Sequence, residues 1–227
     1  MTLAHRIVVA AFRGLTNLLF RIDDEQLARV PERGPLIIVA NHVHILEIPL
    51  IYTCLQPRPI TGLALADRWN NRLLRWLLDV IGAIPLRRGE ADVAAVRKAL
   101  ERLEAGHIVV IDPEGTRSGT GCLQKAHPGV VLLALHSGAP LLPLVHYGSE
   151  GYRENVRRLR RSDFHIVVGK PFKLDAHGEK VTRQVRRQMV DEVMYQMAAL
   201  LPPEYRGAYA DLGAATERYL AFQPDLT

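Results

Sequence analysis

Short apolar runs alternate along this chain with longer segments that have helical period. The runs are rich in β-branched residues or bounded by Gly and Pro, which is typical of buried strands. They lie at 36–39, 60–65, 82–89, 107–111, 141–147 and 164–169. The helical segments lie at 48–55, 71–78, 91–105, 128–137 and 181–201. Strands that alternate with helices in this way predict a single α/β domain, with a largely parallel central sheet and helices on both faces.

The N-terminal segment has the periodicity of a basic amphipathic helix. Such a helix can lie in a membrane interface, or its apolar face can pack on the domain, and both interpretations stay open. No run reaches the roughly 18 apolar residues of a spanning helix, and Arg13 interrupts any signal-peptide core. We therefore expect an interface helix at 1–24, the main domain at 25–205 and a C-terminal tail at 206–227.

Composition narrows the possible partners only a little. The 227 residues carry a formal charge of +5, which suits a nucleic acid, an anionic membrane or a phosphorylated ligand. A run of arginines lies near residue 155: Arg153, Arg157, Arg158, Arg160 and Arg161. It either forms a solvated helix face or attracts anionic lipid or the phosphates of CoA. Cys54 and Cys122 predict free thiols, and no Cys/His spacing predicts a metal site.

Polar clusters follow three of the predicted strands. They are Asn41-His42, Arg87-Arg88 and the turn 113–117, Pro-Glu-Gly-Thr-Arg. In parallel α/β sheets, ligands bind beyond the carboxyl ends of the strands. We therefore expect these clusters to meet at one rim.

His42 and Glu47 are residues of the types that form a general base and its orienting carboxylate. We expect His42 in the first turn of a helix, where the helix dipole keeps the ring neutral and able to take a proton from an alcohol. Glu47, five residues on, can bond the other ring nitrogen and fix the tautomer. Since no protein nucleophile accompanies the pair, the substrate hydroxyl would attack. Such spacing also arises by chance, and His44 is expected to serve packing or loop bonding.

The turn at 113–117 has the residues of an anion site. Gly115 allows close backbone approach, Thr116 offers a hydroxyl, and Arg117 offers a fork for phosphate oxygens. Glu114 can anchor that arginine or accept from a ligand hydroxyl. The turn matches neither a Walker loop nor a dinucleotide fingerprint.

Taken together, four ordered blocks resemble those of the glycerolipid acyltransferases. They are His42-x-x-x-x-Glu47, the segment 82–88, the segment 113–118 and the segment 139–144, with 124–129 similar to that family's Lys-x-Gly segment. The chain is most similar to the bacterial 1-acyl-sn-glycerol-3-phosphate (lysophosphatidate) acyltransferases, over about residues 34–172. It departs from the family at Glu47, where Asp is usual.

The resemblance implies acyl transfer from acyl-CoA or acyl carrier protein to the free hydroxyl of lysophosphatidate, in phospholipid synthesis and without a cofactor. It implies that His42 is the base and that Glu47 orients it. The residues implied to hold the acceptor phosphate are Arg87, Glu114, Gly115, Thr116 and Arg117, with Arg88 and Lys125 as possible further contacts.

We accordingly expect a peripheral protein on the cytoplasmic face of the cell membrane. Another lysophospholipid, or a lyso-ornithine lipid, is the alternative acceptor. A non-catalytic lipid-binding protein on the same scaffold is a rival of another class. Nucleic-acid binding ranks last, because the basic residues are not interleaved with aromatic residues.

Overall fold

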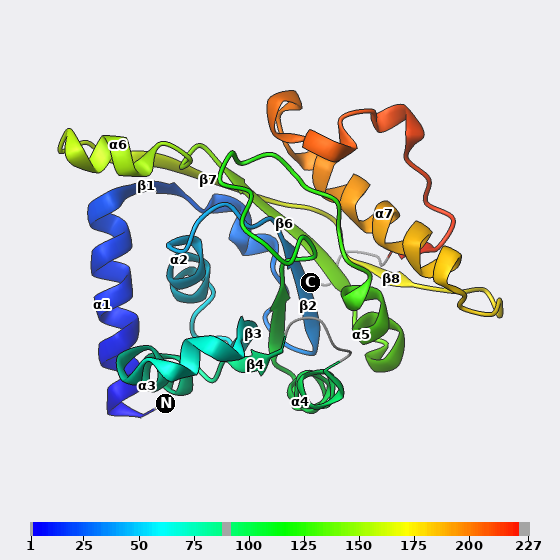
Figure 1. The fold of residues 1–227 in the computed structure, drawn as a ribbon, viewed down its shortest axis with the longest axis horizontal. Helices are drawn as coiled ribbons and strands as arrows, with labels where there is room; N and C mark the ends of the chain where they lie inside the picture. Colours follow the sequence, from blue (N-terminus) through cyan, green and yellow to red (C-terminus); the bar gives the residue numbers. More distant parts are fainter. Residues whose placement is uncertain (1, 88–91, 223–227) are drawn as a thin grey trace.

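The computed structural model describes residues 2–87 and 92–222, and its centre is one mixed β-sheet (Figure 1). The strands are β1 (Phe20–Asp23), β2 (Leu36–Ala40), β3 (Ile60–Leu65), β4 (Ile84–Leu86), β5 (Ile108–Ile111), β6 (Leu141–Tyr147), β7 (Ser162–Val168), β8 (Phe172–Leu174) and β9 (Leu220–Phe222). Their order is β1-β7-β6-β2-β5-β3-β4, with β8 paired to β6 and β9. The strands β6, β2, β5, β3 and β4 are mutually parallel, which confirms the predicted largely parallel sheet.

Helices cover both faces of this sheet. They are α1 (Leu3–Leu19), α2 (Glu47–Cys54), α3 (Arg72–Val80), α4 (Val93–Glu104), α5 (Gly129–Ser137), α6 (Tyr152–Arg157) and α7 (Arg183–Leu200). The boundaries have local causes: Thr182 accepts from the Val185 N–H at the start of α7, and Gly138 ends α5 with a φ of +61°. In Figure 1, α1, α2 and α3 lie on one side of the sheet, and α4, α5 and α7 on the other.

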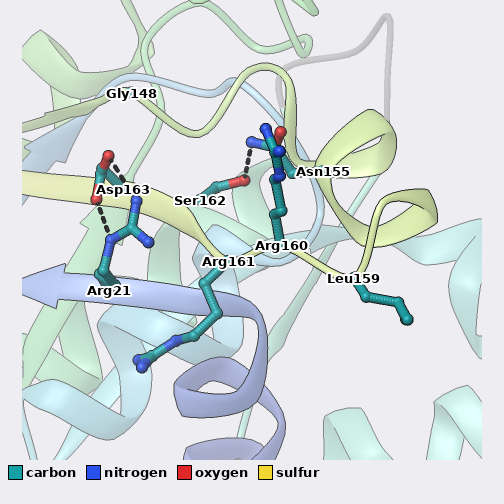
Figure 2. Close-up of a pocket in the computed structure, with 8 residues that line it drawn as sticks. All are labelled: Arg21, Gly148, Asn155, Leu159, Arg160, Arg161, Ser162 and Asp163. Atoms are coloured by element: carbon teal, nitrogen blue, oxygen red, sulfur yellow. Dashed lines mark hydrogen bonds and ion pairs between the residues drawn. The ribbon is translucent and has the colours of Figure 1, made fainter.

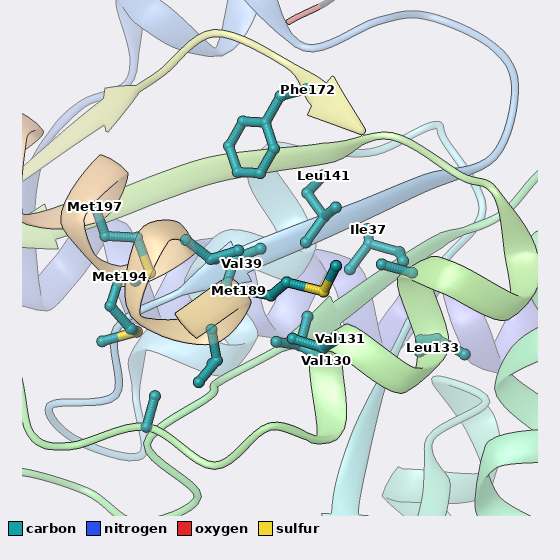
Figure 3. Packing of buried hydrophobic residues seen from close by; sticks show 14 of the residues in the cluster. Ile37, Val39, Val130, Val131, Leu133, Leu141, Phe172, Met189, Met194 and Met197 are labelled. Carbon is teal, nitrogen blue, oxygen red and sulfur yellow. The ribbon is translucent and has the colours of Figure 1, made fainter. Parts of the chain in front are cut away.

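Two apolar cores follow from the alternation of side chains along β2. Ile37 and Val39 face the core that α4, α5 and α7 close, whereas Leu36 and Ile38 face the core under α1 and α2. Three methionines of α7 are completely buried in the first core, against β2, β6 and α5 (Figure 3): Met189, Met194 and Met197. Each such burial contributes about 1.5–3 kcal/mol to folding.

Some elements differ from the sequence-based expectation. The last predicted strand is antiparallel to β6, and the short strands β1, β8 and β9 were not predicted. The N-terminal helix ends at Leu19, because the chain from Phe20 pairs with β7 instead of continuing the helix to residue 24. Among the described residues, no helix has the length and apolar run needed to cross a membrane.

The segment that was expected to be a separate tail belongs to the domain in its described part, up to residue 222. Tyr209 and Tyr219 are buried in the first core, and β9 extends the sheet through β8. The buried carboxylate of Glu192 on α7 holds this segment, since it accepts from the Thr216 hydroxyl and from the N–H groups of Arg218 and Tyr219. Sequence periodicity gave no sign of these contacts.

Candidate active site

The carboxyl ends of β2, β5 and β6 meet at one rim of the sheet. Asn41 joins β2 to β6: its amide donates to the His146 carbonyl (2.9 Å), and its Oδ1 accepts from the His146 N–H (2.9 Å). On the other side, the main chain of His42 is held by the turn after β5. Its N–H donates to Glu114 Oε1 (3.0 Å), and its carbonyl accepts from the Ser118 N–H (2.7 Å). The loop that carries His42 is thus fixed from both neighbouring strands.

Glu47 orients the ring of His42 as the sequence predicted. Its Oε1 is hydrogen-bonded to His42 Nδ1, and its Oε2 accepts from the N–H groups of Val43 and His44, both at 2.9 Å. The carboxylate is 2 % exposed, and His146 Nε2 lies 3.3 Å from Oε2. Because a carboxylate accepts at Nδ1, that nitrogen carries the proton, which leaves Nε2 of His42 as the acceptor.

The electrostatic setting of His42 differs from the expected one. The helix α2 begins at Glu47, so His42 precedes it by a loop and does not lie in its first turn. Burial lowers the pKa of His42, but the hydrogen bond to Glu47 and the negative charge of Asp112 outweigh it and raise the pKa above 6.5, while Arg117 opposes them. The predicted lowering by a helix dipole is therefore wrong.

Glu47 is charged, whereas His44 is neutral. Burial raises the pKa of Glu47, but its hydrogen bonds from His42 and the loop amides lower the pKa more, so the carboxylate is ionised. Burial lowers the pKa of His44 to about 4, which keeps that ring neutral. His44 Nε2 lies 2.9 Å from the Ser149 hydroxyl, and its Nδ1 accepts from the Leu46 N–H. His44 therefore serves packing and loop bonding, as expected.

Glu114 has neighbours other than those predicted. Its Oε1 accepts from His42, and its Oε2 accepts from the Gln124 N–H (2.8 Å). The side chain is buried, and burial raises its pKa while these hydrogen bonds oppose the change. A carboxylate occupied by two main-chain donors ties the loops together. Its expected contact with the acceptor phosphate stays a prediction.

Gly115 turns the chain with a φ of +66°, which L residues other than glycine rarely adopt. A Cβ added there would lie 3.1 Å from His127 Cδ2. The turn leaves the side chains of Thr116 and Arg117 exposed, and Arg117 is close enough to His42 to act on its pKa. Their expected contact with a ligand stays a prediction.

The remaining predicted contacts come from other parts of the structure. Arg87 is exposed and directly follows the edge strand β4, which lies two strands from β5, and the Arg87 N–H donates to Asp92. Arg88 lies outside the described residues. Lys125 lines a cavity of about 850 Å³ between α7 and the C-terminal segment, together with Arg187 and Tyr209.

A second, separate pocket of about 530 Å³ lies between β1, β7 and the end of α6 (Figure 2). Two of its arginines already have partners: Arg21 pairs with Asp163, and Arg161 donates to the Phe20 carbonyl. Leu159 beside it is almost fully exposed.

Two residues near His42 escaped the sequence analysis, Asp112 and His146, and Asn41 was expected only as part of a polar cluster at the rim, without a role of its own. Asn41 and Asp112 each stand just beyond an apolar strand, and His146 interrupts one, so polar residues at strand ends were the available signal. Their role depends on the order β6-β2-β5, which the sequence does not contain.

These features define an α/β protein with a His–carboxylate pair at the carboxyl rim of its sheet. The family model described as Acyltransferase matches residues 21–147, which is more than half of the chain and includes the whole of this pair and the turn after β5. The chain belongs to the acyltransferase family.

Individual curated proteins are similar to this chain over only part of their own length. A lyso-ornithine lipid O-acyltransferase of Pseudomonas aeruginosa is 32% identical over 52% of this chain and 46% of its own. A chloroplastic 1-acyl-sn-glycerol-3-phosphate acyltransferase of Arabidopsis thaliana is 26% identical over 71% of this chain and 45% of its own. The chain thus spans about half the length of these curated relatives.

The fold also matches a solved structure. The crystal structure of the 1-acyl-sn-glycerophosphate acyltransferase PlsC from Thermotoga maritima aligns with a TM-score of 0.58 and 21% identity, over 86% of this chain and 76% of that one. This similarity establishes the fold.

Proposed function

We propose that this protein transfers an acyl group from a thioester, acyl-CoA or acyl carrier protein, to the free hydroxyl of a lysolipid, with lysophosphatidate as the acceptor. The observation that carries the proposal is the His42 ring held at Nδ1 by the buried Glu47, with Nε2 left as a proton acceptor. Family membership and the names of the relatives support the same chemistry.

The reaction requires one base and no protein nucleophile. His42 Nε2 takes the proton from the acceptor hydroxyl as its oxygen attacks the thioester carbonyl. When the tetrahedral intermediate collapses, the C–S bond breaks and the ring returns the proton to the leaving thiolate. Glu47 stays ionised and stabilises the imidazolium that forms between these steps. The products are the diacyl lipid and the free thiol.

The acceptor headgroup is assigned to the exposed side of the turn after β5. Arg117 and Thr116 supply a guanidinium fork and a hydroxyl, which are suitable partners for phosphate oxygens. Arg87 remains a predicted further contact from the same rim. Glu114 joins the turn to the His42 loop through its hydrogen bonds, and it stays a predicted contact of the acceptor headgroup together with Gly115.

Membrane association on the cytoplasmic face is part of the proposal. The helix α1 exposes an apolar stripe of Leu3, Ile7, Leu15 and Leu18, each at least 42% exposed, and α3, which contacts α1, exposes Leu73 and Trp76. Ile45 and Ile48, also exposed, stand on either side of Glu47. Exposed apolar side chains on these helices and beside Glu47 suit a peripheral enzyme whose acceptor is a lipid.

Vesicle sedimentation tests that association. Ile7→Asp with Leu18→Asp should move most of the protein from the pelleted vesicles to the supernatant. Val93→Asp is the matched control, because Val93 is 74% exposed on α4, across the sheet from α1 (Figure 1). Equal binding of all three proteins would contradict the assignment of the stripe.

The acceptor is tested by identifying the product. Palmitoyl-CoA is offered with either lysophosphatidate or lyso-ornithine lipid, and the acylated lipid is measured by mass spectrometry. We expect phosphatidate from the wild type, and a KM for lysophosphatidate raised at least about tenfold in Arg117→Gln, since a charged hydrogen-bond partner is lost. Faster acylation of lyso-ornithine lipid, which the 32% identical relative favours as second candidate, would overturn the choice of acceptor.

A further inference from the structure

A second carboxylate stands beside the ring nitrogen that Glu47 holds. Asp112 follows the last residue of β5, and β5 pairs in parallel with β2, with Val39 opposite Ile111. This register brings Asp112 level with the loop that leaves β2. Asp112 Oδ2 lies 3.8 Å from His42 Nδ1, the nitrogen that is bonded to Glu47.

The position of Asp112 is fixed by its own turn. Its carbonyl accepts from the Gly115 N–H (3.0 Å), and the next carbonyl, of Pro113, accepts from the His127 N–H (2.8 Å). The side chain of Asp112 is 29% exposed, so it is neither part of the core nor free in solvent. The main chain of the turn therefore holds the Asp112 carboxylate beside the ring of His42.

We propose that Asp112 is a second positioning carboxylate for His42, which acts with Glu47 on the same ring nitrogen. This inference rests on the proposed function, in which His42 is the base. Glu47 makes the hydrogen bond that sets the tautomer. Asp112 adds negative charge on the same side of the ring, and this charge stabilises the imidazolium formed during proton transfer. Asp112 is also the nearest substitute acceptor for the Nδ1–H of His42 when the hydrogen bond to Glu47 is weakened.

Several charged and titratable groups lie near Asp112 and His42. They are Glu47 on α2, Glu114 and Arg117 on the turn after β5, His146 on β6 and His44 on the same loop as His42. Burial and the two glutamates raise the pKa of Asp112 to about 7, while His42 opposes the change. Asp112 and His42 are therefore coupled electrostatically, so a change in the charge of one shifts the pKa of the other.

The first test removes the charge of Asp112 and keeps its shape. In Asp112→Asn, the titration of the His42 ring, followed by NMR and assigned by its loss in His42→Ala, should move about one pH unit toward acid. That shift corresponds to two charges 3.8 Å apart at an effective dielectric between that of water and that of a protein surface. Asp163→Asn is the matched control. Asp163 lies on β7 and pairs with Arg21 of β1, so its substitution should leave the titration of His42 unchanged.

The second test is kinetic and shows whether the two carboxylates act together. The acidic limb of kcat/KM should shift in the same direction in Asp112→Asn, with a loss at the plateau of less than about tenfold. The loss from Asp112→Asn should be several times larger when combined with Glu47→Asp, whose shorter side chain holds the ring less well.

An unshifted ring titration in Asp112→Asn, or strictly additive losses in the double variant, would overturn the inference while leaving the base assignment intact. A wild type without transferase activity would refute the proposed function instead, and the NMR titration would still decide whether Asp112 acts on His42.

Discussion

Replacing Glu47 by glutamine tests how the active ring is held. The two main-chain N–H groups of Val43 and His44 both point at Oε2, so the single amide oxygen of glutamine must take that place. Its NH₂ group then faces Nδ1 of His42, which becomes an acceptor, and the ring proton moves to Nε2. A ring protonated at Nε2 cannot accept a proton from the hydroxyl of the acceptor lipid.

The expected loss is large. An amide in place of the orienting carboxylate of a catalytic triad lowers kcat by about 10⁴ through the wrong tautomer, equal to about 5 kcal/mol of transition-state stabilisation. Stability should change little, since the main-chain donors keep their acceptor. A cost of about 1 kcal/mol would lower Tm by only about 2–4 °C in a chain of this size.

The assay is thiol release from palmitoyl-CoA with lysophosphatidate in detergent, for the wild type, Glu47→Gln and Glu47→Asp, with circular dichroism to monitor folding. Glu47→Asp keeps the charge and should retain at least about a tenth of the activity. A folded Glu47→Gln protein with kcat within tenfold of the wild type would refute the reasoning, because the ring would then keep its active tautomer without the carboxylate.

Three further predictions follow from particular contacts. First, His42 acts when neutral, and Glu47 and Asp112 raise its pKa above 6.5 despite burial. We therefore expect kcat/KM to fall as the pH decreases through a midpoint above 6.5, and a midpoint below 6 would contradict this. Second, Gly115→Ala should lower the free energy of unfolding by about 1–2 kcal/mol because of the left-handed backbone, and by more because the added Cβ contacts His127. Gly119 has a φ of +69° and no heavy atom within 4 Å of an added Cβ, so Gly119→Ala should show the backbone cost alone in thermal unfolding. Third, Glu192→Ala leaves the buried Tyr219 N–H and the partly buried donors of Thr216 and Arg218 without their acceptor, so it should lower stability by about 3 kcal/mol and expose the C-terminal segment to limited proteolysis. An unchanged Tm would show that this segment does not need the carboxylate.

The local part of the site was predictable because it depends on spacing within one segment. Glu47 lies five positions after His42, and a hydrogen bond joins the two side chains in the structure. The rim was predictable as well, since parallel strands place their carboxyl ends on one edge. The starting point of α2 was not, because an apolar sequence after His42 does not reveal that the helix begins five residues later.

The rest depends on strand order. His146 and Asp112 reach His42 only because β6 and β5 flank β2, and nothing in the local pattern selects these neighbours. The same holds for Glu114, whose carboxylate receives donors from two other loops and so holds the loops together. The strands β1 and β9 are short and stabilised by partners far along the sequence, so their own residues give no strand signal.

The central claim is that His42 activates the hydroxyl of a lysolipid toward a thioester. The most direct measurement compares thiol release from palmitoyl-CoA by the wild type and by His42→Ala, each with and without lysophosphatidate. The account predicts release by the wild type that depends on the acceptor, and no such release by a folded His42→Ala protein. Acceptor-dependent release that survives in His42→Ala would contradict the assignment of the base. No release by the wild type, with acyl-CoA or with acyl carrier protein as donor, would contradict the transferase itself and favour a lipid-binding protein on this scaffold.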